Sequence, residues 1–284
     1  NDPHRTFDAT AFEPDPNKIH HPRGMPDTKA LRKDLASYLG EIQRLDHNVG
    51  ELLKELEKRG LTKNTLVVFM GDNGGALLRG KGTLYDLGLH VPLIARWPNK
   101  IKANQKTDVL ISGEDIAPTF LAIANARIPK EVTGKSFVAT FSNPSYSPRD
   151  LVFAVRGAHA SALPNGTASF DLGRAVFDKR YKLVYNALWQ LPYQPVDFGN
   201  QPFWIELKKQ HQEGTLAPEY AALFFAAQRP MFEVFDLQED PYELKNLAGE
   251  ANISQVERKL KADLQEWMIL NQDYLPLPLR QGNK

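Results

Sequence analysis

The sequence contains no cysteine, which excludes a disulfide framework, a thiolate zinc site and a cysteine nucleophile within these 284 residues. An excess of either charge is also missing, because 35 Lys and Arg residues stand against 34 Asp and Glu residues. We therefore expect no nucleic-acid partner and no membrane surface held by bulk positive charge. No apolar run approaches the roughly 20 residues that a membrane-spanning helix needs, so no span is expected.

The chain is long enough to bury a sizeable core. Its composition of 42% apolar and 24% charged residues suits one large core, or a core plus a smaller subdomain. Residues 1–4 contain neither a start methionine nor a signal peptide, so we expect that a preceding segment has been removed. Residues 1–26 carry five prolines and no sustained periodicity, which predicts an irregular loop.

The next segment predicts a long helix that leads into a buried strand. From Asp27 onward, apolar side chains recur in alternating steps of four and three residues, and Gly60 can end the helix. Residues 64–70 form a short β-branched and apolar run without polar alternation, which is typical of a strand covered on both faces in a parallel sheet. A helix that feeds such a strand indicates an α/β fold. The helical positions are Leu31, Leu35, Tyr38, Ile42, Leu45, Val49, Leu52 and Leu56.

Polar loops follow this strand. Residues 71–75 read Gly-Asp-Asn-Gly-Gly, and a loop that contains Lys81 comes next, before a second apolar strand at residues 91–97. Residues 109–112 predict a third short strand, and residues 114–125 predict a short amphipathic helix. Loops beyond the carboxyl ends of parallel strands are where open α/β sheets bind ligands, so we expect the functional site here.

The composition changes near residue 148. Residues 141–148 have the composition of a linker, so we predict two units, residues 1–148 and residues 149–284. In the second unit, apolar strands are separated by turns such as residues 178–180 rather than by crossover helices, which favours antiparallel pairing in an α+β subdomain. The predicted strands are 151–155, 174–177, 181–185 and 232–237, and the closing amphipathic helix is 253–270.

Asp72 and Asn73 are candidate metal ligands. They end a buried strand although Asp and Asn are poor strand formers, and two adjacent oxygens can supply part of the shell of Ca²⁺ or Mg²⁺. The alternative is an Asx turn, because Asp-Asn-Gly is also a common turn sequence. Two ligands fall short of the six to eight that calcium takes, so further ligands would come from outside this segment.

Lys81 and His4 are candidates for contact with an anionic substrate. Lys81 lies between two glycines, where a flexible ammonium suits a tetrahedral anion, and the alternative is a solvated loop lysine. The segment resembles a nucleotide-binding P-loop but departs from it, since Gly82 stands where Ser or Thr should contact magnesium, so we do not expect a nucleotide site. His4 titrates near neutrality and can protonate a leaving group, although an isolated histidine is more often structural or exposed.

Taken in order, these segments resemble the later part of the type I sulfatases, members of the alkaline phosphatase superfamily. The resemblance covers nearly the entire chain, and it implies an α/β fold with an alkaline-phosphatase-like sheet and flanking helices, here only the later part, plus a smaller C-terminal antiparallel subdomain. The segments that carry it are the strand at 65–69, Asp72-Asn73-Gly74, Gly-Lys-Gly-Thr at 80–83, Tyr85-Asp86, the strand to Trp-Pro at 91–98, and the stretch at 235–248.

The resemblance also implies residue roles. Asp72 and Asn73 would ligate one active-site Ca²⁺, Lys81 would contact the sulfate, and His4 would bind the sulfate or assist departure of the leaving group. Family members attack sulfur with a formylglycine, made from Cys or Ser in a Cys/Ser-x-Pro-x-Arg segment. This chain has none, because Ser147 lacks the intervening residue before proline. We therefore expect the nucleophile and the remaining calcium ligands upstream, and the chain alone to be inactive.

The expected substrate is a sulfated saccharide, with glycosaminoglycan-derived glucosamine units favoured. Residues 2–5 are similar to the histidine segment of the sulfamidase (N-sulfoglucosamine sulfohydrolase) branch of the family, whereas Lys81 stands where sulfamidases have arginine and O-sulfatases have lysine. Two alternatives stay open, a phosphate ester hydrolase of the same superfamily and a non-catalytic remnant that binds sulfated glycans. Family analogy implies a secreted, periplasmic or lysosomal protein, and leaves room for an oligomer.

Overall fold

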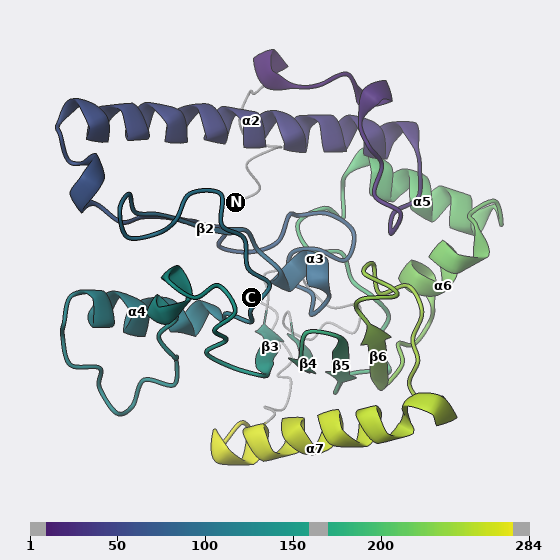
Figure 1. Ribbon diagram of the computed structural model, residues 1–284. Helices are drawn as coiled ribbons and strands as arrows, with labels where there is room; N and C mark the ends of the chain where they lie inside the picture. Colours follow the sequence, from purple (N-terminus) through teal and green to yellow (C-terminus); the bar gives the residue numbers. More distant parts are fainter. Residues whose placement is uncertain (1–9, 159–169, 275–284) are drawn as a thin grey trace, which may run out of the picture.

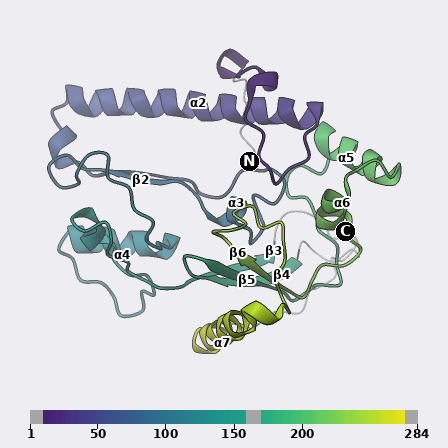
Figure 2. The ribbon, with the colours of Figure 1, turned by 45° about the vertical axis from the view of Figure 1, so that its right-hand side comes forward.

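The structure is a computed structural model that describes residues 10–158 and 170–274. Helix α2 lies at one end of the molecule and helix α7 at the other, with the strands between them (Figures 1 and 2). None of the described helices is long and apolar enough to cross a membrane. The elements are α2 (Lys29–Lys58), β1 (Val67–Met70), α3 (Asp86–Leu89), β2 (Leu93–Arg96), α4 (Ile116–Ile123), β3 (Val152–Ala158), β4 (Phe170–Phe177), β5 (Tyr181–Asn186), α5 (Pro202–Gln212), α6 (Pro218–Phe225), β6 (Phe232–Asp236) and α7 (Ser254–Leu270).

Helix α2 confirms the predicted long helix. It begins after Thr28, whose hydroxyl oxygen accepts a hydrogen bond from the backbone N–H of Leu31 at 3.1 Å and so caps the first turn. Only the start of its apolar stripe is covered by the described chain. Leu31 and Leu35 are buried, whereas Ile42 and Leu52 are 43% and 65% exposed.

Strands β1 and β2 pair antiparallel, with Val67 opposite Arg96 and Met70 opposite Leu93, so the predicted parallel pairing is wrong here. Parallel neighbours need a crossover connection, usually a helix. The chain between these two strands instead turns back at their ends and contains only the four-residue α3. Coverage on both faces is also wrong for this chain, since Met70 and Ile94 are 43% and 60% exposed.

The segment before α4 differs from its prediction. In the described part of the chain, residues 109–112 form no strand. The reason is local, because the backbone N–H of Ser112 donates to the carboxylate of Asp115 at 2.8 Å and prepares the N-terminus of a helix. The predicted helix at 114–125 is confirmed as α4, preceded by a short 3₁₀ turn at Gly113–Asp115.

Strands β3 to β6 form one antiparallel sheet in sequence order, which confirms the predicted antiparallel pairing. The turn between β4 and β5 is fixed by Asp178, whose carboxylate accepts the backbone N–H groups of Arg180 and Tyr181 at 2.7 Å each. Helix α7 covers one face of this sheet (Figure 2). The buried side chains between them are Val176, Leu183, Val234, Ile253, Leu260 and Leu264.

Helices α5 and α6 were not anticipated from the sequence. They are not crossovers between strands of the sheet; instead they pack beside the first turns of α2. Each begins with a proline in its first turn, at Pro202 and Pro218, which is where proline is tolerated in a helix. Their core with α2 is rich in aromatic rings and contains Phe198, Phe203, Trp204 and Phe224 together with Leu31, Leu35, Leu77 and Leu78.

The predicted linker ends at a buried ion pair. Arg149 Nη1 lies 2.9 Å from Glu114 Oε1, and the Arg149 guanidinium also binds the carboxylate of Asp115, which is completely buried. Residue 149 is thereby tied to the start of α4. The division of the chain into units 1–148 and 149–284 stays a prediction.

Candidate functional site

The loop between β1 and α3 carries Asp72, Asn73 and Lys81, and it folds back on its own start. The backbone N–H of Lys81 donates to the carbonyl of Gly75 at 2.8 Å. A side chain at Gly80 would place its Cβ 2.2 Å from that same carbonyl oxygen, so only glycine permits this close approach. The fold-back sets the Lys81 backbone beside the turn that contains Asp72 and Asn73.

Asp72 and Asn73 are exposed directly after β1. Asp72 Oδ1 accepts the backbone N–H of Asn73 at 2.9 Å, and Asn73 Nδ2 donates to the carbonyl of Gly74 at 2.8 Å. The turn interpretation and the ligand interpretation are therefore compatible, because the turn presents a carboxylate and an amide, both of which supply oxygens of the kind that Ca²⁺ takes. Within the described ranges, no group of three or more His, Asp or Glu side chains could hold a metal ion. The pair thus fits only part of a calcium shell.

The ammonium of Lys81 is paired rather than simply solvated. Its Nζ lies 2.5 Å from Oδ2 of Asp197, and the two side chains are 15% and 27% exposed. Asp197 belongs to the segment between β5 and α5, so the contact joins two parts of the chain that are distant in sequence. His4 lies outside the described residues. The catalytic and binding roles of Lys81 and His4, and metal ligation by Asp72 and Asn73, stay predictions.

Arg79 fixes the loop from its buried side. Its backbone is in the left-handed region with a φ of 57°, and its guanidinium carbon stands 3.5 Å from the centre of the Tyr85 ring. Its Nη2 donates to the carbonyl of Glu243 at 2.7 Å, and its backbone N–H donates to the hydroxyl of Tyr193 at 3.2 Å. The stacked and hydrogen-bonded arginine therefore ties the Lys81 loop to later parts of the chain.

Lys182 provides a second support. It is completely buried in β5, and its Nζ lies 2.8 Å from Glu243 Oε1 and 3.3 Å from Asp86 Oδ1. Glu243 Oε2 also accepts the backbone N–H of Asp86 at 2.6 Å, which holds the first residue of α3. A buried lysine with two carboxylates is a compensated charge, so this cluster resists displacement of the loop end.

Asp86 also pairs with His90 at the other end of α3, at 3.0 Å between Oδ2 and Nδ1. Burial acts to raise the pKa of Asp86, but the hydrogen bond from His90 and the charge of Lys182 outweigh it and lower that pKa. In return, the hydrogen bond to Asp86 raises the pKa of His90, against the opposing effect of burial. His90 is thus a surface partner of this cluster.

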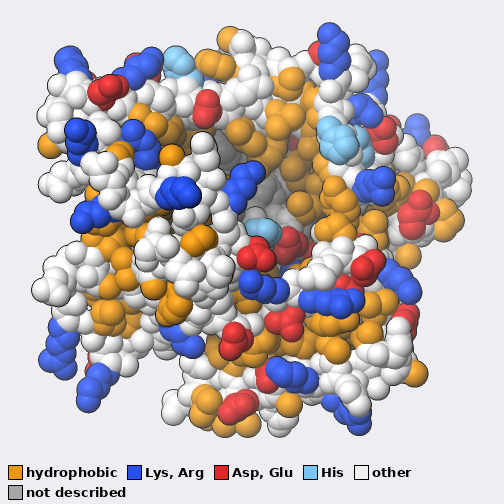
Figure 3. Space-filling model, viewed as in Figure 1, with side chains coloured by type: hydrophobic (Ala, Val, Ile, Leu, Met, Phe, Trp, Pro, Cys, Tyr) orange, Lys and Arg blue, Asp and Glu red, His pale blue; other side chains and the backbone are white. Residues whose placement is uncertain are grey.

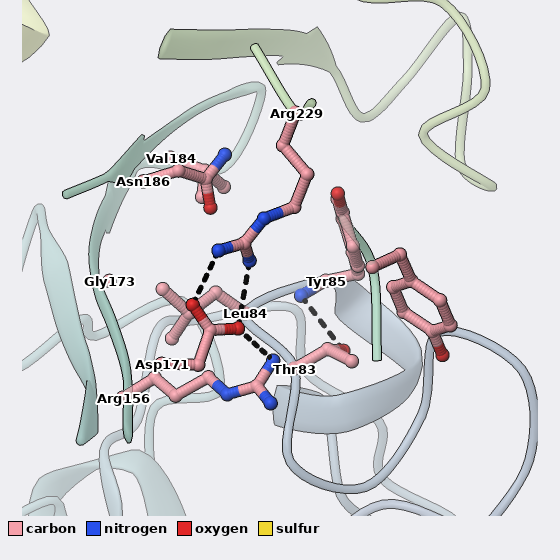
Figure 4. A pocket seen from close by; sticks show the side chains of 10 residues that line it. Thr83, Leu84, Tyr85, Arg156, Asp171, Gly173, Val184, Asn186 and Arg229 are labelled. Atoms are coloured by element: carbon pink, nitrogen blue, oxygen red, sulfur yellow. Dashed lines mark hydrogen bonds and ion pairs between the residues drawn. The ribbon is translucent and has the colours of Figure 1, made fainter. Parts of the chain in front are cut away.

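A small cavity behind the loop is bounded by paired charges (Figure 4). Arg229 and Arg156 approach the carboxylate of Asp171 from two sides, and Arg156 Nη1 lies 2.8 Å from its Oδ2. Burial raises the pKa of nearby Glu233, which accepts the hydroxyl of Tyr85 at 3.0 Å. The cavity volume is about 20 Å³, the size of one water molecule, so this region supports the loop and does not admit a saccharide.

On the face drawn in Figure 3, basic and acidic side chains lie close together near the centre of the view. The β1–α3 loop with Lys81 and the paired Asp197 combines both charges in this manner. An anion that approaches Lys81 meets an ammonium whose position is already restricted by Asp197.

Sequence reasoning found the loop residues but missed their supports. Asp197, Glu243 and Arg79 lie in segments without a local pattern that predicts their partners. Lys182 did give a signal, because it is a charged residue within the apolar strand that spans Tyr181–Asn186. A lysine at such a position requires a buried counter-charge, which here is Glu243.

Two family models match parts of the chain. Residues 2–126 match the sulfatase family, and residues 78–202 match the C-terminal part of N-sulphoglucosamine sulphohydrolase. The chain belongs to the sulfatase family, within the alkaline phosphatase superfamily. Its later part resembles N-sulphoglucosamine sulphohydrolase.

Individual relatives are similar over most of the chain. An ulvan-active sulfatase of Formosa agariphila is 34% identical over 92% of the chain, which spans 42% of that relative. Human N-sulphoglucosamine sulphohydrolase is 29% identical over 93% of the chain, which spans 53% of that relative. The chain therefore spans about half the length of the curated relatives it matches.

The fold is also similar to that of solved structures. One neighbour, determined in complex with its substrate D-glucosamine-2-N,6-O-disulfate, has a TM-score of 0.62 and 22% sequence identity. The match covers 88% of this chain and 44% of that protein. This likeness supports a mixed α/β sulfatase-like fold.

Proposed function

We propose that the full-length protein containing this chain hydrolyses sulfate esters or sulfamates of sulfated saccharides. The observation that carries the proposal is the fold-back of the β1–α3 loop, which brings the Lys81 backbone to Gly75, two residues after Asn73. Because the chain is similar to sulfatases, we interpret Lys81, Asp72 and Asn73 together as part of a sulfate-binding site. A bound cation and an ammonium close to one another would suit a substrate whose sulfuryl oxygens carry negative charge.

In this proposal each site residue has one task. Asp72 and Asn73 supply two of the oxygen ligands of a Ca²⁺, which when bound neutralises charge on the sulfuryl oxygens. Lys81 donates to a sulfate oxygen, and His4 binds the sulfate or gives a proton to the leaving oxygen or nitrogen. The nucleophile, a formylglycine in this family, is supplied from outside this sequence, together with the remaining calcium ligands.

Two of the similar proteins support a proposal for the saccharide class. The human relative is named for N-sulphoglucosamine, and the solved neighbour holds a glucosamine that carries both N- and 6-O-sulfate. We infer a sulfated glucosamine unit as substrate. Lys81, which the O-sulfatases share by resemblance, favours an ester position over the sulfamate nitrogen.

Exposed apolar surface supports the need for a further segment. Ile42 and Leu52 on α2 and Ile94 on β2 are all more than 40% exposed, and they stand on the elements that precede and follow the β1–α3 loop. Exposed apolar side chains that gather on one surface can mark a binding face. We propose that the upstream part of the protein covers it and brings the nucleophile to Lys81.

The experiment uses the full-length protein with D-glucosamine-2-N,6-O-disulfate as substrate, and it measures sulfate release and calcium binding by calorimetry. Asp72→Ala should weaken calcium binding at least about tenfold, the effect of losing a charged ligand. Asp150→Ala, which removes an exposed carboxylate elsewhere, is the matched control. Unchanged calcium affinity in Asp72→Ala would refute the metal assignment, and no sulfate release by the parent protein would refute the function.

A further inference from the structure

Asp197 is the partner of Lys81 in the described structure. The 2.5 Å between Lys81 Nζ and Asp197 Oδ2 is a charge-assisted hydrogen bond, and both side chains are mostly buried. A surface ion pair of this kind would contribute little, but exclusion of water strengthens this one. The pair is therefore a defined feature of the site and not a chance contact.

The backbone around Asp197 is built to hold the carboxylate at this place. Its φ of 64° lies in the left-handed region, which Asp and Asn tolerate better than most residues. Its neighbours Val196 and Phe198 are each only 1% exposed, so the segment is anchored on both sides of Asp197. Val196 also faces the Lys81 loop, since a Cβ added at Gly82 would lie 2.8 Å from Val196 Cγ2.

We propose that Asp197 is a positioning residue, which holds the Lys81 ammonium in the direction of the sulfate. This inference rests on the proposed function, because it assumes that Lys81 contacts the substrate. A lysine side chain has four rotatable bonds and loses considerable freedom when it is fixed. Asp197 restricts that freedom before the substrate arrives. The ammonium has three N–H donors, so one bond to Asp197 leaves others for a sulfate oxygen.

Asp197 acts through Lys81 in this view, and a double-mutant cycle can detect that. The variants of the full-length protein are Asp197→Asn, Lys81→Met and the double variant. Asparagine keeps the shape of the side chain and tolerates a positive φ, so the change removes the charge without straining the backbone. Asp108→Asn is the control, because Asp108 pairs with a lysine at 3.3 Å on the exposed surface.

The measurements are kcat and KM for D-glucosamine-2-N,6-O-disulfate together with the thermal midpoint. We expect Asp197→Asn to lower kcat/KM about tenfold, Lys81→Met to lower it further, and the double variant to equal Lys81→Met. The thermal midpoint of each variant shows whether the protein is folded at the temperature of the assay, so that a loss of rate is not mistaken for a loss of folded protein. Asp108→Asn should match the parent in rate.

Each result decides between the two proposals. If Asp197→Asn stays within twofold of the parent while Lys81→Met is strongly impaired, the positioning role is wrong and the proposed function stands. If the two losses simply multiply in the double variant, Asp197 does not act through Lys81 and the positioning role is again wrong. If Lys81→Met leaves the rate unchanged, the substrate contact of the proposed function fails, and the role of Asp197 fails with it.

Discussion

The two sheets of this chain differ in how completely they are covered. In the four-stranded sheet, Val176, Leu183 and Val234 have no exposed surface, because α7 lies across them. In the two-stranded sheet, Met70 and Ile94 keep 43% and 60% of their surface exposed. The first sheet obtains its core from within the chain, whereas the second has apolar faces that the described residues leave open.

The difference also separates the supports of the site from its reactive side. Lys182 lies in the four-stranded sheet and holds the loop end through Asp86. Asp72 and Asn73 lie at the end of the two-stranded sheet and are exposed. The end of the Lys81 loop is therefore fixed from the four-stranded sheet, whereas the two candidate metal ligands stand exposed at the end of the two-stranded one.

The largest expected loss of stability comes from removing the buried charge of Lys182 in the four-stranded sheet. Lys182→Met leaves Glu243, which is 2% exposed, without its cation. Removing one partner of a buried pair costs about 3–5 kcal/mol, so the free energy of unfolding of the full-length protein should fall by that amount. Denaturant unfolding measures it.

The control for this change is Lys245→Met. Lys245 pairs with Glu250 at 3.4 Å, but the two side chains are 70% and 39% exposed. Lys245→Met should lower the free energy of unfolding by less than about 1 kcal/mol. If the two variants lowered the free energy of unfolding equally, burial would not be the reason that the Lys182 cluster stabilises the protein.

The next prediction concerns whether the two-stranded sheet is covered in the full-length protein. Leu183→Ala in the covered sheet should cost about 2–5 kcal/mol, the usual range for a buried leucine. If the upstream segment packs on β2, Ile94→Ala should cost about 2 kcal/mol or more in the same measurement. A cost below about 0.5 kcal/mol, typical of an exposed site, would show that Ile94 stays uncovered.

The smallest effect is the pH dependence of the Asp86–His90 pair. The pKa of His90 is raised above its ordinary value of 6.5, so the pair contributes fully below that value and its contribution is lost as the pH rises through the raised pKa. The pKa of Asp86 is lowered below 3.8, so the contribution is lost again in acid, as the pH falls through it.

Thermal midpoints at pH 6 and pH 9 measure this effect in the parent and in His90→Gln. Because the His90 side chain is 79% exposed, the difference should correspond to only about 0.2–1 kcal/mol. The parent should lose this stability on going to pH 9, and His90→Gln should not. The same pH response in both proteins would contradict the assignment to His90.

The elements that could be predicted are those with a strong local pattern. The period of α2, the apolar runs of β5 and β6 and the Asp-Asn-Gly turn are all local, and so are Asp72, Asn73 and Lys81 as candidates. The direction of β2 was not predictable in this way, because an apolar run does not say which neighbour pairs with it. Helices α5 and α6 escaped for a related reason, since their aromatic cores depend on contact with α2.

The supports of the site depend on tertiary structure. Lys81 and Asp197, or Lys182 and Glu243, meet only when distant segments fold together. A family resemblance assigns roles to motif residues but does not identify the partners outside the motifs. Physical reasoning about charge can recover part of this, since a lysine in an apolar strand requires a carboxylate nearby.

The ion pairs of Arg149 matter for anyone who wishes to study the two parts of the chain separately. A cut at residue 148, where the composition changes, would take Arg149 away from Glu114 and from the completely buried Asp115. The N-terminal piece would then carry an unneutralised carboxylate in its interior and would express poorly or aggregate. A piece that ends after Arg149 would keep this counter-ion. It would still lose the aromatic core that α5 and α6 form with α2 and the pairing of Lys182 with Asp86, so neither boundary isolates the first part of the chain.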